Sequence, residues 1–485
     1  MPVTKTALEN AFKQQSSRLS PRKVSLFSQA IPLLVLGLSL FIFAMAYFAQ
    51  GLFAWSAGLA YIFYDTALLV FVAWQTLPLL KNKDNRADIQ VSTMIKAPSI
   101  GVIIAAYNES EVLERTIESL LKQTHPPEQI LIADDGSTDS TADLLAKQYG
   151  FNAPIEDVFT QALASTNTRN LYWLRVKHGG KARALNRAIV EMNTDIVITV
   201  DADTLLADDA IEVMRNAFAS EPALVAATGV LTPVCSNKIT GQFLQWFQTY
   251  EYIRNFISRF AWMRANSLLL ISGAFAGFRR DALITVGGFD ADCLVEDYEL
   301  IHRMRRYAAD QQLNWQVRVL GSAQARTSAP STFYGFLQQR RRWFAGFLQT
   351  QYWHRDMIAN RRYGNLGIWM LPVKTIDTVQ PFYGLIAFLF LIYFLISGKL
   401  TLLASIFVVI GVKILIDLIF HCWSIYLYKR WTNDKAKAQF SLAILAAILE
   451  PFTFQLLRHT GAVLGWYYFL TGRRAWGKQQ RHLID

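Results

Sequence analysis

The stretch TDIVITVDADT, residues 194–204, joins a short apolar run to two aspartates, Asp201 and Asp203, which one small residue separates. An apolar run of this length between polar flanks is typical of a buried β-strand. Residues 99–107 (SIGVIIAAY) and 128–137 (EQILIADDGS) repeat the design, because each run ends in polar residues and a helical pattern follows. Three such units predict an α/β sheet with its functional site at the carboxyl ends of the strands.

Acidic residues at two of these strand ends predict a site for a divalent cation. Asp134 and Asp135 follow one strand, and Asp201 and Asp203 follow another. Each pair alone also fits a polar loop or an Asp-capped turn. Two acidic ends in one sheet, however, supply the carboxylates with which proteins hold Mg²⁺ beside substrate phosphates. We therefore expect a cation and a phosphorylated substrate at this edge of the sheet.

A basic helix start lies between the two acidic ends. In KHGGKARALNRAI, residues 177–189, two glycines open a helix and Lys181 and Arg183 occupy its first turn. Cations in the first turn oppose the helix dipole, and a bound diphosphate would remove that conflict. The simpler alternative is a solvated basic helix start.

A third acidic pair, Glu296 and Asp297, begins another helix in CLVEDYELIHRM, residues 293–304. Acids in a first turn complement the helix dipole, and this alone explains the pair. The functional alternative is that one carboxylate acts as a general base, which accepts a proton from a hydroxyl beside a metal-bound diphosphate.

The composition favours some classes of protein over others. Only 18% of the 485 residues are charged, whereas about 25% is usual for a soluble protein. The net charge of +11 fits an anionic membrane surface or a phosphorylated substrate as well as nucleic acid. Because no groove-reading motif is present, we expect no nucleic-acid partner. Three widely separated cysteines predict neither a disulfide framework nor a metal cluster.

Long apolar segments flank the α/β region on both sides. Residues 31–49 carry no charge and are about long enough to cross a bilayer. Residues 52–80 form a second apolar run, in which Asp65 is the only charged residue. Basic residues follow the second run, so the positive-inside rule places the N-terminus and the middle of the chain in the cytosol. Residues 383–397 and 402–428 are further candidate spans. Charged residues and a proline interrupt residues 440–470, where we expect a broken or re-entrant segment.

Two charges lie inside one of these candidate spans. Lys413 and Asp417 are four residues apart, so they share one helix face and can pair. Ions within a membrane usually face a bundle interior or a wet cavity. Both a water-filled channel and a buried structural pair fit this pattern.

Taken in order, these segments resemble the family-two inverting glycosyltransferases, and within them the membrane-embedded processive synthases of cellulose, chitin, hyaluronan and poly-N-acetylglucosamine. The likeness covers most of residues 98–345, and the apolar flanks extend it to nearly the whole chain. The matching pieces are AAYNES (105–110), DDGSTD (134–139), GGKARALNRAI (179–189), DADT (201–204), SGAFAGFRR (272–280), VEDYEL (295–300) and QQRRRW (338–343).

The resemblance implies a cytosolic catalytic domain of the GT-A type, an α/β fold flanked by transmembrane helices and interfacial amphipathic helices. Asp134 or Asp135 would contact the uracil and ribose of a UDP-sugar. Asp201 and Asp203 match the metal motif, with Mg²⁺ or Mn²⁺ bridging the diphosphate, and Lys181 would help to stabilise the charge on UDP.

The resemblance also implies roles at the reacting sugar. Asp297 matches the general base of a T-E-D motif, in which Val295 here replaces the threonine, and Glu296 would contact the acceptor. The remaining residues expected to shape the acceptor or sugar pocket are Gly273, Ala274 and Phe275.

The block LQQRRRWFAGFLQ, residues 337–349, contains the Q-x-x-R-W motif of the family. Gln339 and Arg342 would hold the diphosphate, because arginine offers planar bidentate hydrogen bonds to phosphate, and the ring of Trp343 would stack under the acceptor sugar. We expect the two other arginines of the block, at 340 and 341, to meet lipid phosphates, at about 1 kcal/mol each. The alternative is a basic anchor beside the membrane.

The expected organisation has six parts. They are a basic cytosolic N-terminus (1–30), two transmembrane helices (31–80), the GT-A domain (95–330), the interfacial helix with Q-x-x-R-W (331–362), a C-terminal transmembrane and re-entrant region (365–471) and a basic cytosolic tail (472–485).

The expected function is processive transfer of a sugar from a UDP-sugar to a growing β-linked polysaccharide, and the expected product is an N-acetylhexosamine polymer. The protein would be a multi-pass protein of the plasma (inner) membrane that translocates its product, and an accessory membrane subunit is a further expected partner. The alternatives are a non-processive transferase for a lipid acceptor, of the ceramide or polyprenyl-phosphate type, and a non-catalytic membrane scaffold.

Overall fold

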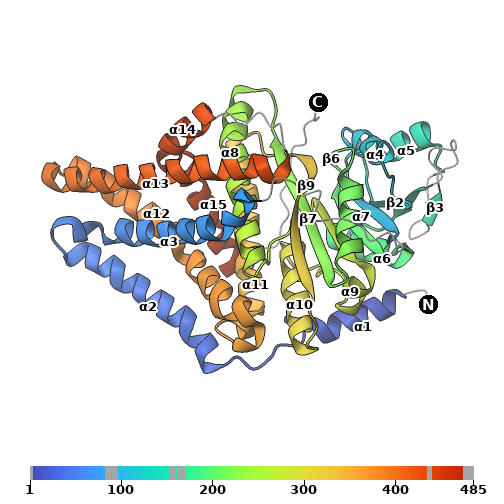
Figure 1. Ribbon diagram of the computed structural model, residues 1–485, viewed down its shortest axis with the longest axis horizontal. Helices are drawn as coiled ribbons and strands as arrows, with labels where there is room; N and C mark the ends of the chain where they lie inside the picture. The colour runs from blue at the N-terminus through green and yellow to red at the C-terminus, as the bar shows by residue number, and fades with distance from the viewer. Residues whose placement is uncertain (1–3, 82–96, 153–158, 162–169, 434–439, 473–485) are drawn as a thin grey trace.

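The computed structural model describes residues 4–81, 97–152, 159–161, 170–433 and 440–472. Of the basic tail predicted over 472–485, all but the first residue lies outside the described part. Figure 1 shows a sheet domain on one side and long apolar helices on the other, with α8 (Ile239–Arg264), α11 (Phe333–Trp353) and α15 (Phe454–Leu470) between them.

The sheet has nine strands in the order β3-β4-β2-β1-β5-β8-β7-β9-β6. Its central strand β1 (Ile100–Ala106) pairs in parallel with β2 (Gln129–Asp134) on one side and with β5 (Ile196–Asp201) on the other. These are the three runs that the sequence predicts as buried strands, and the α/β fold class is confirmed. Because Ala106 pairs with Asp134 and Ala105 with Asp201, both acidic strand ends lie beside the end of β1.

An antiparallel strand completes the functional edge of the sheet. β8 (Phe275–Arg279) runs antiparallel to β5, with Phe275 opposite Val200. The loop before β8 therefore meets the carboxyl end of β5, and the backbone N–H of Asp201 donates to the carbonyl of Ala274 at 3.3 Å. The other strands are β3 (Phe159–Gln161), β4 (Leu171–Arg175), β6 (Thr204–Leu206), β7 (Leu224–Val234) and β9 (Gln316–Ser328).

Helices on both sides of the sheet bury its apolar strands. Before the first of these helices, Asn108 adopts a positive φ of 56°, and its side-chain oxygen accepts a hydrogen bond from the backbone N–H of Thr138. The helices of this domain are α4 (Leu113–Leu121), α5 (Thr141–Tyr149), α6 (Lys181–Glu191), α7 (Ala210–Ser220), α9 (Arg280–Thr285) and α10 (Glu296–Asp310).

The N-terminal segment lies against the sheet domain before the first apolar helix begins. Its helix α1 (Lys5–Gln15) packs so closely on Gly287 that a Cβ added there would clash with the backbone of Phe12. Arg18 then pairs with Asp290 at 3.0 Å. The chain start and the sheet therefore lie on the same side of the apolar helices (Figure 1).

Four helices in the described part of the chain are long and apolar enough to span a membrane. Their exposed faces carry large apolar side chains, as lipid contact requires, and they support membrane association. They are α2 (Leu26–Phe48), the helix Gly51–Leu80 that contains α3 (Ser56–Thr76), the helix Leu366–Ile396 that contains α12 (Leu371–Ile396), and α13 (Leu400–Thr432).

The segment expected to be broken or re-entrant is a bent pair of helices. α14 (Phe440–Leu449) and the short turn η7 (Glu450–Phe452) meet α15 at an angle of 47°. Two glycines of α15 allow it to pack closely on α11. A Cβ added at Gly461 would lie 2.6 Å from the Cβ of Arg340, and a Cβ added at Gly465 would lie 2.8 Å from the Cβ of Phe344. Small residues four apart allow such close approach of two helices.

Arg340 and Arg341 do not match the expectation that they contact lipid phosphates, because both have partners within the protein. The guanidinium of Arg341 lies 3.9 Å from the ring centroid of Tyr468 on α15. Arg340 pairs with Glu251 of α8 at 2.6 Å and has a side chain only 11% exposed. The close packing of three helices turns both cations toward protein partners.

The α11–α15 contact can be tested with Gly465→Ala. The new methyl group would lie 2.9 Å from the carbonyl oxygen of Arg341, and overpacking of this kind costs about 1–3 kcal/mol. We expect a lower Tm in detergent micelles. The control Gly411→Ala on α13 meets no atom within 4 Å and should keep or raise the Tm, because alanine is the better helix former. Equal Tm values for the two variants would contradict the contact.

Candidate active site

The two aspartates after β2 have different roles. Asp135 accepts hydrogen bonds from the backbone N–H groups of Gly179 and Gly180, both at 2.9 Å, and so fixes the loop that leads into α6. Asp134 accepts from the backbone of Ser137 through Oδ1 at 2.8 Å, while its buried Oδ2 has no hydrogen-bond partner. A buried carboxylate oxygen normally has a donor, so Asp134 is the one with capacity left for a ligand.

Three residues that the sequence did not single out adjoin these aspartates. The ring of Tyr107 stacks on His178, with 4.2 Å between centroids, and Arg175 at the end of β4 lies 3.8 Å from the carboxylate of Asp134. The position of Tyr107 directly after a strand was the only signal. The contacts of Arg175 and His178 depend on the order of the strands.

Lys181 joins residues from three separate segments. Its ammonium lies 2.5 Å from Oδ1 of Asp201, at the end of β5, and 3.6 Å from Oε1 of Glu296, at the start of α10. Burial by itself lowers the pKa of Lys181, but the two carboxylates outweigh it and raise the pKa. Burial raises the pKa of Glu296, although Lys181 opposes that shift. The ammonium group of Lys181 is therefore paired with carboxylates inside the protein, so the alternative of a solvated basic helix start does not apply to this residue.

Asp297 faces the loop before β8. Its Oδ2 accepts from the backbone N–H of Gly273 at 2.7 Å, and its Oδ1 accepts from the backbone of Tyr298 at 2.8 Å. An added Cβ on Gly273 would lie 3.0 Å from Oδ2, so only glycine leaves the carboxylate in this position undisturbed. Phe275, by contrast, is fully buried in β8 against Gly229, so its ring belongs to the core and not to a pocket wall.

One face of α11 packs against the segment that precedes Glu296. Arg342 donates to the carbonyl of Leu294 at 3.1 Å, and Gln349 accepts from the backbone N–H of the same residue at 3.1 Å. Between them, an added Cβ on Gly346 would meet Val295 at 2.6 Å. The valine that stands in place of a threonine thus has an apolar partner on α11. Gln339 of this helix is buried, and its amide oxygen has no hydrogen-bond partner.

The carboxylates suit a cation that a substrate helps to hold. Asp201 already binds the ammonium of Lys181, which shows that this position attracts positive charge. Asp203 follows two residues later and is 3% exposed. Within the described residues, no three or more His, Cys, Asp or Glu side chains form a group that could hold a metal ion. Such a pair fits Mg²⁺ or Mn²⁺ only with further ligands such as substrate phosphates and water.

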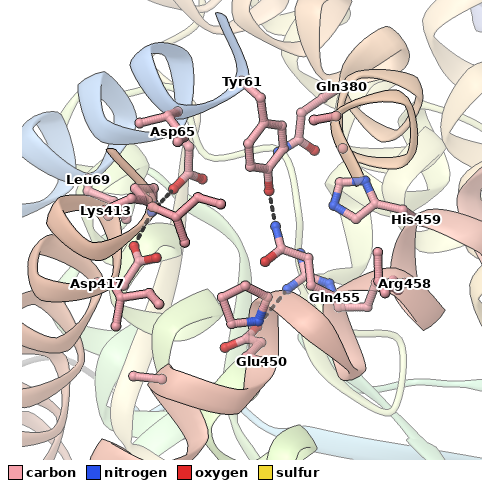
Figure 2. Close-up of a pocket in the computed structure, with 18 of the residues that line it drawn as sticks. Tyr61, Asp65, Leu69, Gln380, Lys413, Asp417, Glu450, Gln455, Arg458 and His459 are labelled. Carbon is pink, nitrogen blue, oxygen red and sulfur yellow. Dashed lines mark hydrogen bonds and ion pairs between the residues drawn. The ribbon is translucent and has the colours of Figure 1, made fainter. Parts of the chain in front are cut away.

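A cavity of about 290 Å³ lies among the apolar helices, and both charged and apolar side chains line it. On one side, Lys413 of α13 pairs with Asp65 of α3 at 2.8 Å and with Asp417, as the spacing in the sequence predicts. Figure 2 shows this group facing Glu450 of η7 and Arg458 of α15. The other charged residues that line the cavity are Glu251 and Arg254 of α8, and its aromatic residues are Trp55, Tyr61, Phe388, Phe420 and Phe452.

Gly273→Ala tests whether the loop before β8 sets the position of Asp297. The methyl group would lie 3.0 Å from Oδ2 and would shift this oxygen by a few tenths of an ångström. A misplacement of about 1 Å can cost about 10²-fold in rate, so this smaller shift should lower kcat several-fold if Asp297 is the general base that the resemblance implies. The affinity for the nucleotide should be kept. Gly37→Ala on α2, which meets no atom within 4 Å, is the control. An unchanged kcat in Gly273→Ala would show that this contact is dispensable.

Comparison with known proteins identifies the family. The family model "Glycosyl transferase family 2" matches residues 101–287, and "Glycosyl transferase family group 2" matches residues 196–416. Poly-beta-1,6-N-acetyl-D-glucosamine synthase of Staphylococcus epidermidis is 30% identical over 307 residues, which are 63% of this chain and 68% of that protein. The same enzyme of Staphylococcus aureus strain COL is 27% identical over 308 residues, 63% of this chain and 67% of that protein.

Among solved structures, a mannosyltransferase from Pyrobaculum calidifontis in complex with GDP-mannose and Mn²⁺ matches with a TM-score of 0.53 and 18% sequence identity. The match covers 82% of this chain and 99% of that one, and it supports the GT-A fold. The protein is therefore a nucleotide-sugar glycosyltransferase, and the chain belongs to glycosyl transferase family 2.

Proposed function

We propose that the protein transfers N-acetylhexosamine units from a UDP-sugar to a growing β-linked polysaccharide and moves the product across the plasma (inner) membrane. The observation that carries the proposal is the contact of Lys181 with both Asp201 and Glu296. It joins the acidic strand end to the acidic helix start, next to Asp297 and beside α11. The similarity to poly-beta-1,6-N-acetyl-D-glucosamine synthases supports the choice of sugar.

The donor would bind along the edge from β2 to β5. Asp134, which has a buried oxygen without a hydrogen-bond partner, would accept a hydrogen bond from the nucleoside. Asp201 and Asp203 would hold Mg²⁺ or Mn²⁺, which supplies positive charge against the diphosphate. Lys181 lies at the same carboxylate, and Arg342 and Gln339 of α11 would complete the diphosphate site. Their cationic and amide donors would stabilise the negative charge that develops on UDP as it leaves.

The acceptor would be activated by Asp297. The backbone N–H of Gly273 holds one oxygen of this carboxylate, so the group is oriented for a hydroxyl that approaches from the loop before β8. Asp297 takes the hydroxyl proton as the acceptor oxygen forms its bond to the anomeric carbon and the bond from that carbon to UDP breaks. A single displacement inverts the configuration, so an α-linked donor gives a β-linked product. Glu296 and the ring of Trp343 would contact the acceptor sugar.

The cavity among the apolar helices favours a polymer over a lipid acceptor. A glycan that crosses the apolar helices needs hydrogen-bonding groups and aromatic faces along its path, and the cavity offers both. A ceramide or polyprenyl-phosphate acceptor would stay in the lipid and would not require them. The charged residues of the lining number four carboxylates and three cations, namely Asp65, Glu251, Asp417 and Glu450 against Arg254, Lys413 and Arg458. A small negative balance suits an uncharged polymer better than a polyanion.

The direct test uses the purified protein in lipid nanodiscs with Mg²⁺ or Mn²⁺ and labelled UDP-N-acetylglucosamine, and it measures product size. We expect a polymer that a matching glycan hydrolase degrades, and no product after addition of EDTA. A lipid-soluble monoglycoside as the sole product would reject the polymer. Activity that returns only with membrane extract would indicate that an accessory subunit is required.

Asp297→Asn tests the general base. The amide keeps the size of the side chain but cannot take a proton, so we expect transfer to fall by about 10²–10⁴-fold. UDP affinity, measured by calorimetry, should stay within about twofold of wild type. The control Asp281→Asn removes an exposed helix acid of α9 and should leave both quantities unchanged. Full transfer activity in Asp297→Asn would favour a different base and revive the scaffold alternative.

A further inference from the structure

Glu251 is a buried carboxylate that no step proposed above uses. It lies on α8, is 3% exposed, and forms an ion pair with Arg340 of α11 at 2.6 Å. Its second oxygen lies 3.4 Å from Arg458 of α15. Because Glu251 also lines the cavity among the apolar helices, this one carboxylate connects α11, the bent helix pair and the cavity wall.

Arg340 in turn lies between two aromatic rings of α11. Its guanidinium carbon is 4.6 Å from the ring centroid of Phe336 and 4.6 Å from that of Trp343. The three residues are spaced by four and three positions, so they share one face of the helix. A cation against an indole face is worth about 0.5–2 kcal/mol, depending on how far it is desolvated. The position of the Trp343 ring is therefore tied to the position of the guanidinium.

The guanidinium depends on Glu251 for its own position. The side chain of Arg340 is 11% exposed, and its Nε already lacks a hydrogen-bond partner. Removal of the Glu251 charge would leave a cation in a nearly dry site, which is costly. The guanidinium would then move toward other acceptors or water, and the contact with the indole ring would be lost.

We propose that Glu251 is a positioning residue for acceptor binding, which acts on Trp343 through Arg340. The inference rests on the proposed contact between Trp343 and the acceptor sugar. A purely structural role, in which Glu251 only joins α8 to α11 and α15, predicts a loss of stability that is independent of Trp343. Coupling between the two residues separates these roles.

The experiment measures the affinity of the protein in nanodiscs for two ligands. One is UDP, and the other is an oligosaccharide acceptor prepared by partial hydrolysis of the wild-type product and titrated in the presence of UDP. Affinity is measured instead of turnover because a dissociation constant can be determined even for a variant that has no activity. The variants are Glu251→Gln, Trp343→Leu and the double variant. The matched control is Glu221→Gln. It removes a carboxylate that pairs with Arg318 at 2.7 Å, away from α11.

We expect Glu251→Gln to weaken acceptor binding by about tenfold, the size of a partly buried cation–π contact, with UDP affinity unchanged. In the Trp343→Leu background the same substitution should cost less than about twofold. Glu221→Gln should change neither affinity. If Glu251→Gln does not fold, Arg340→Lys takes its place, since it keeps the ion pair but loses the planar group between the rings, and the same coupling is expected.

Additive losses in the double variant, or unchanged acceptor affinity in Glu251→Gln, would overturn the inference and leave the proposed function intact. Unchanged acceptor affinity in Trp343→Leu would overturn the acceptor role of Trp343 itself, and with it the premise. The two failures are therefore distinguishable.

Discussion

The site depends on one interaction, the pairing of the Lys181 ammonium group with the carboxylates of Asp201 and Glu296. Asp201 and Glu296 come from a strand and a helix nearly a hundred residues apart, and with Asp297 they place several carboxylates near one another at the sheet edge. Like charges at close range repel, and the burial of Glu296 by itself raises the pKa of that carboxyl group. One ammonium between two of them allows the strand end and the helix start to converge. A diphosphate with its divalent cation brings both signs of charge to the same place, so a group that stabilises the fold also serves the proposed chemistry.

Helix α11 connects this site to the apolar helices. Consecutive residues of a helix point about 100° apart, so its three successive arginines reach three different partners. Arg340 pairs with Glu251 of α8, Arg341 stacks on Tyr468 of α15, and Arg342 binds the carbonyl of Leu294 before the acidic helix start. A cluster that looks in sequence like a uniform basic anchor is thus three specific contacts. They connect the sheet domain to the bent helix pair and to the cavity among the apolar helices.

Local patterns predicted the parts of the fold that depend on local sequence. The three parallel strands, with Asp134 and Asp201 at their ends, and the interrupted C-terminal segment follow from apolar runs and their breaks. The contacts of the site follow from topology instead. The antiparallel β8 brings Gly273 to Asp297, and no periodicity in the sequence indicates that pairing. Phe275 looked like a pocket residue because its neighbours are small, but strand pairing places it in the core.

The central claim is that one site at the carboxyl edge of the sheet binds the nucleotide between Lys181 and α11. A cryo-EM structure of the protein in nanodiscs with UDP and Mn²⁺ tests it most directly. The account predicts the uridine beside Asp134 and the diphosphate and cation within bonding distance of Asp203 and Arg342. A nucleotide bound elsewhere, with Lys181 still paired only to Asp201 and Glu296, would contradict it.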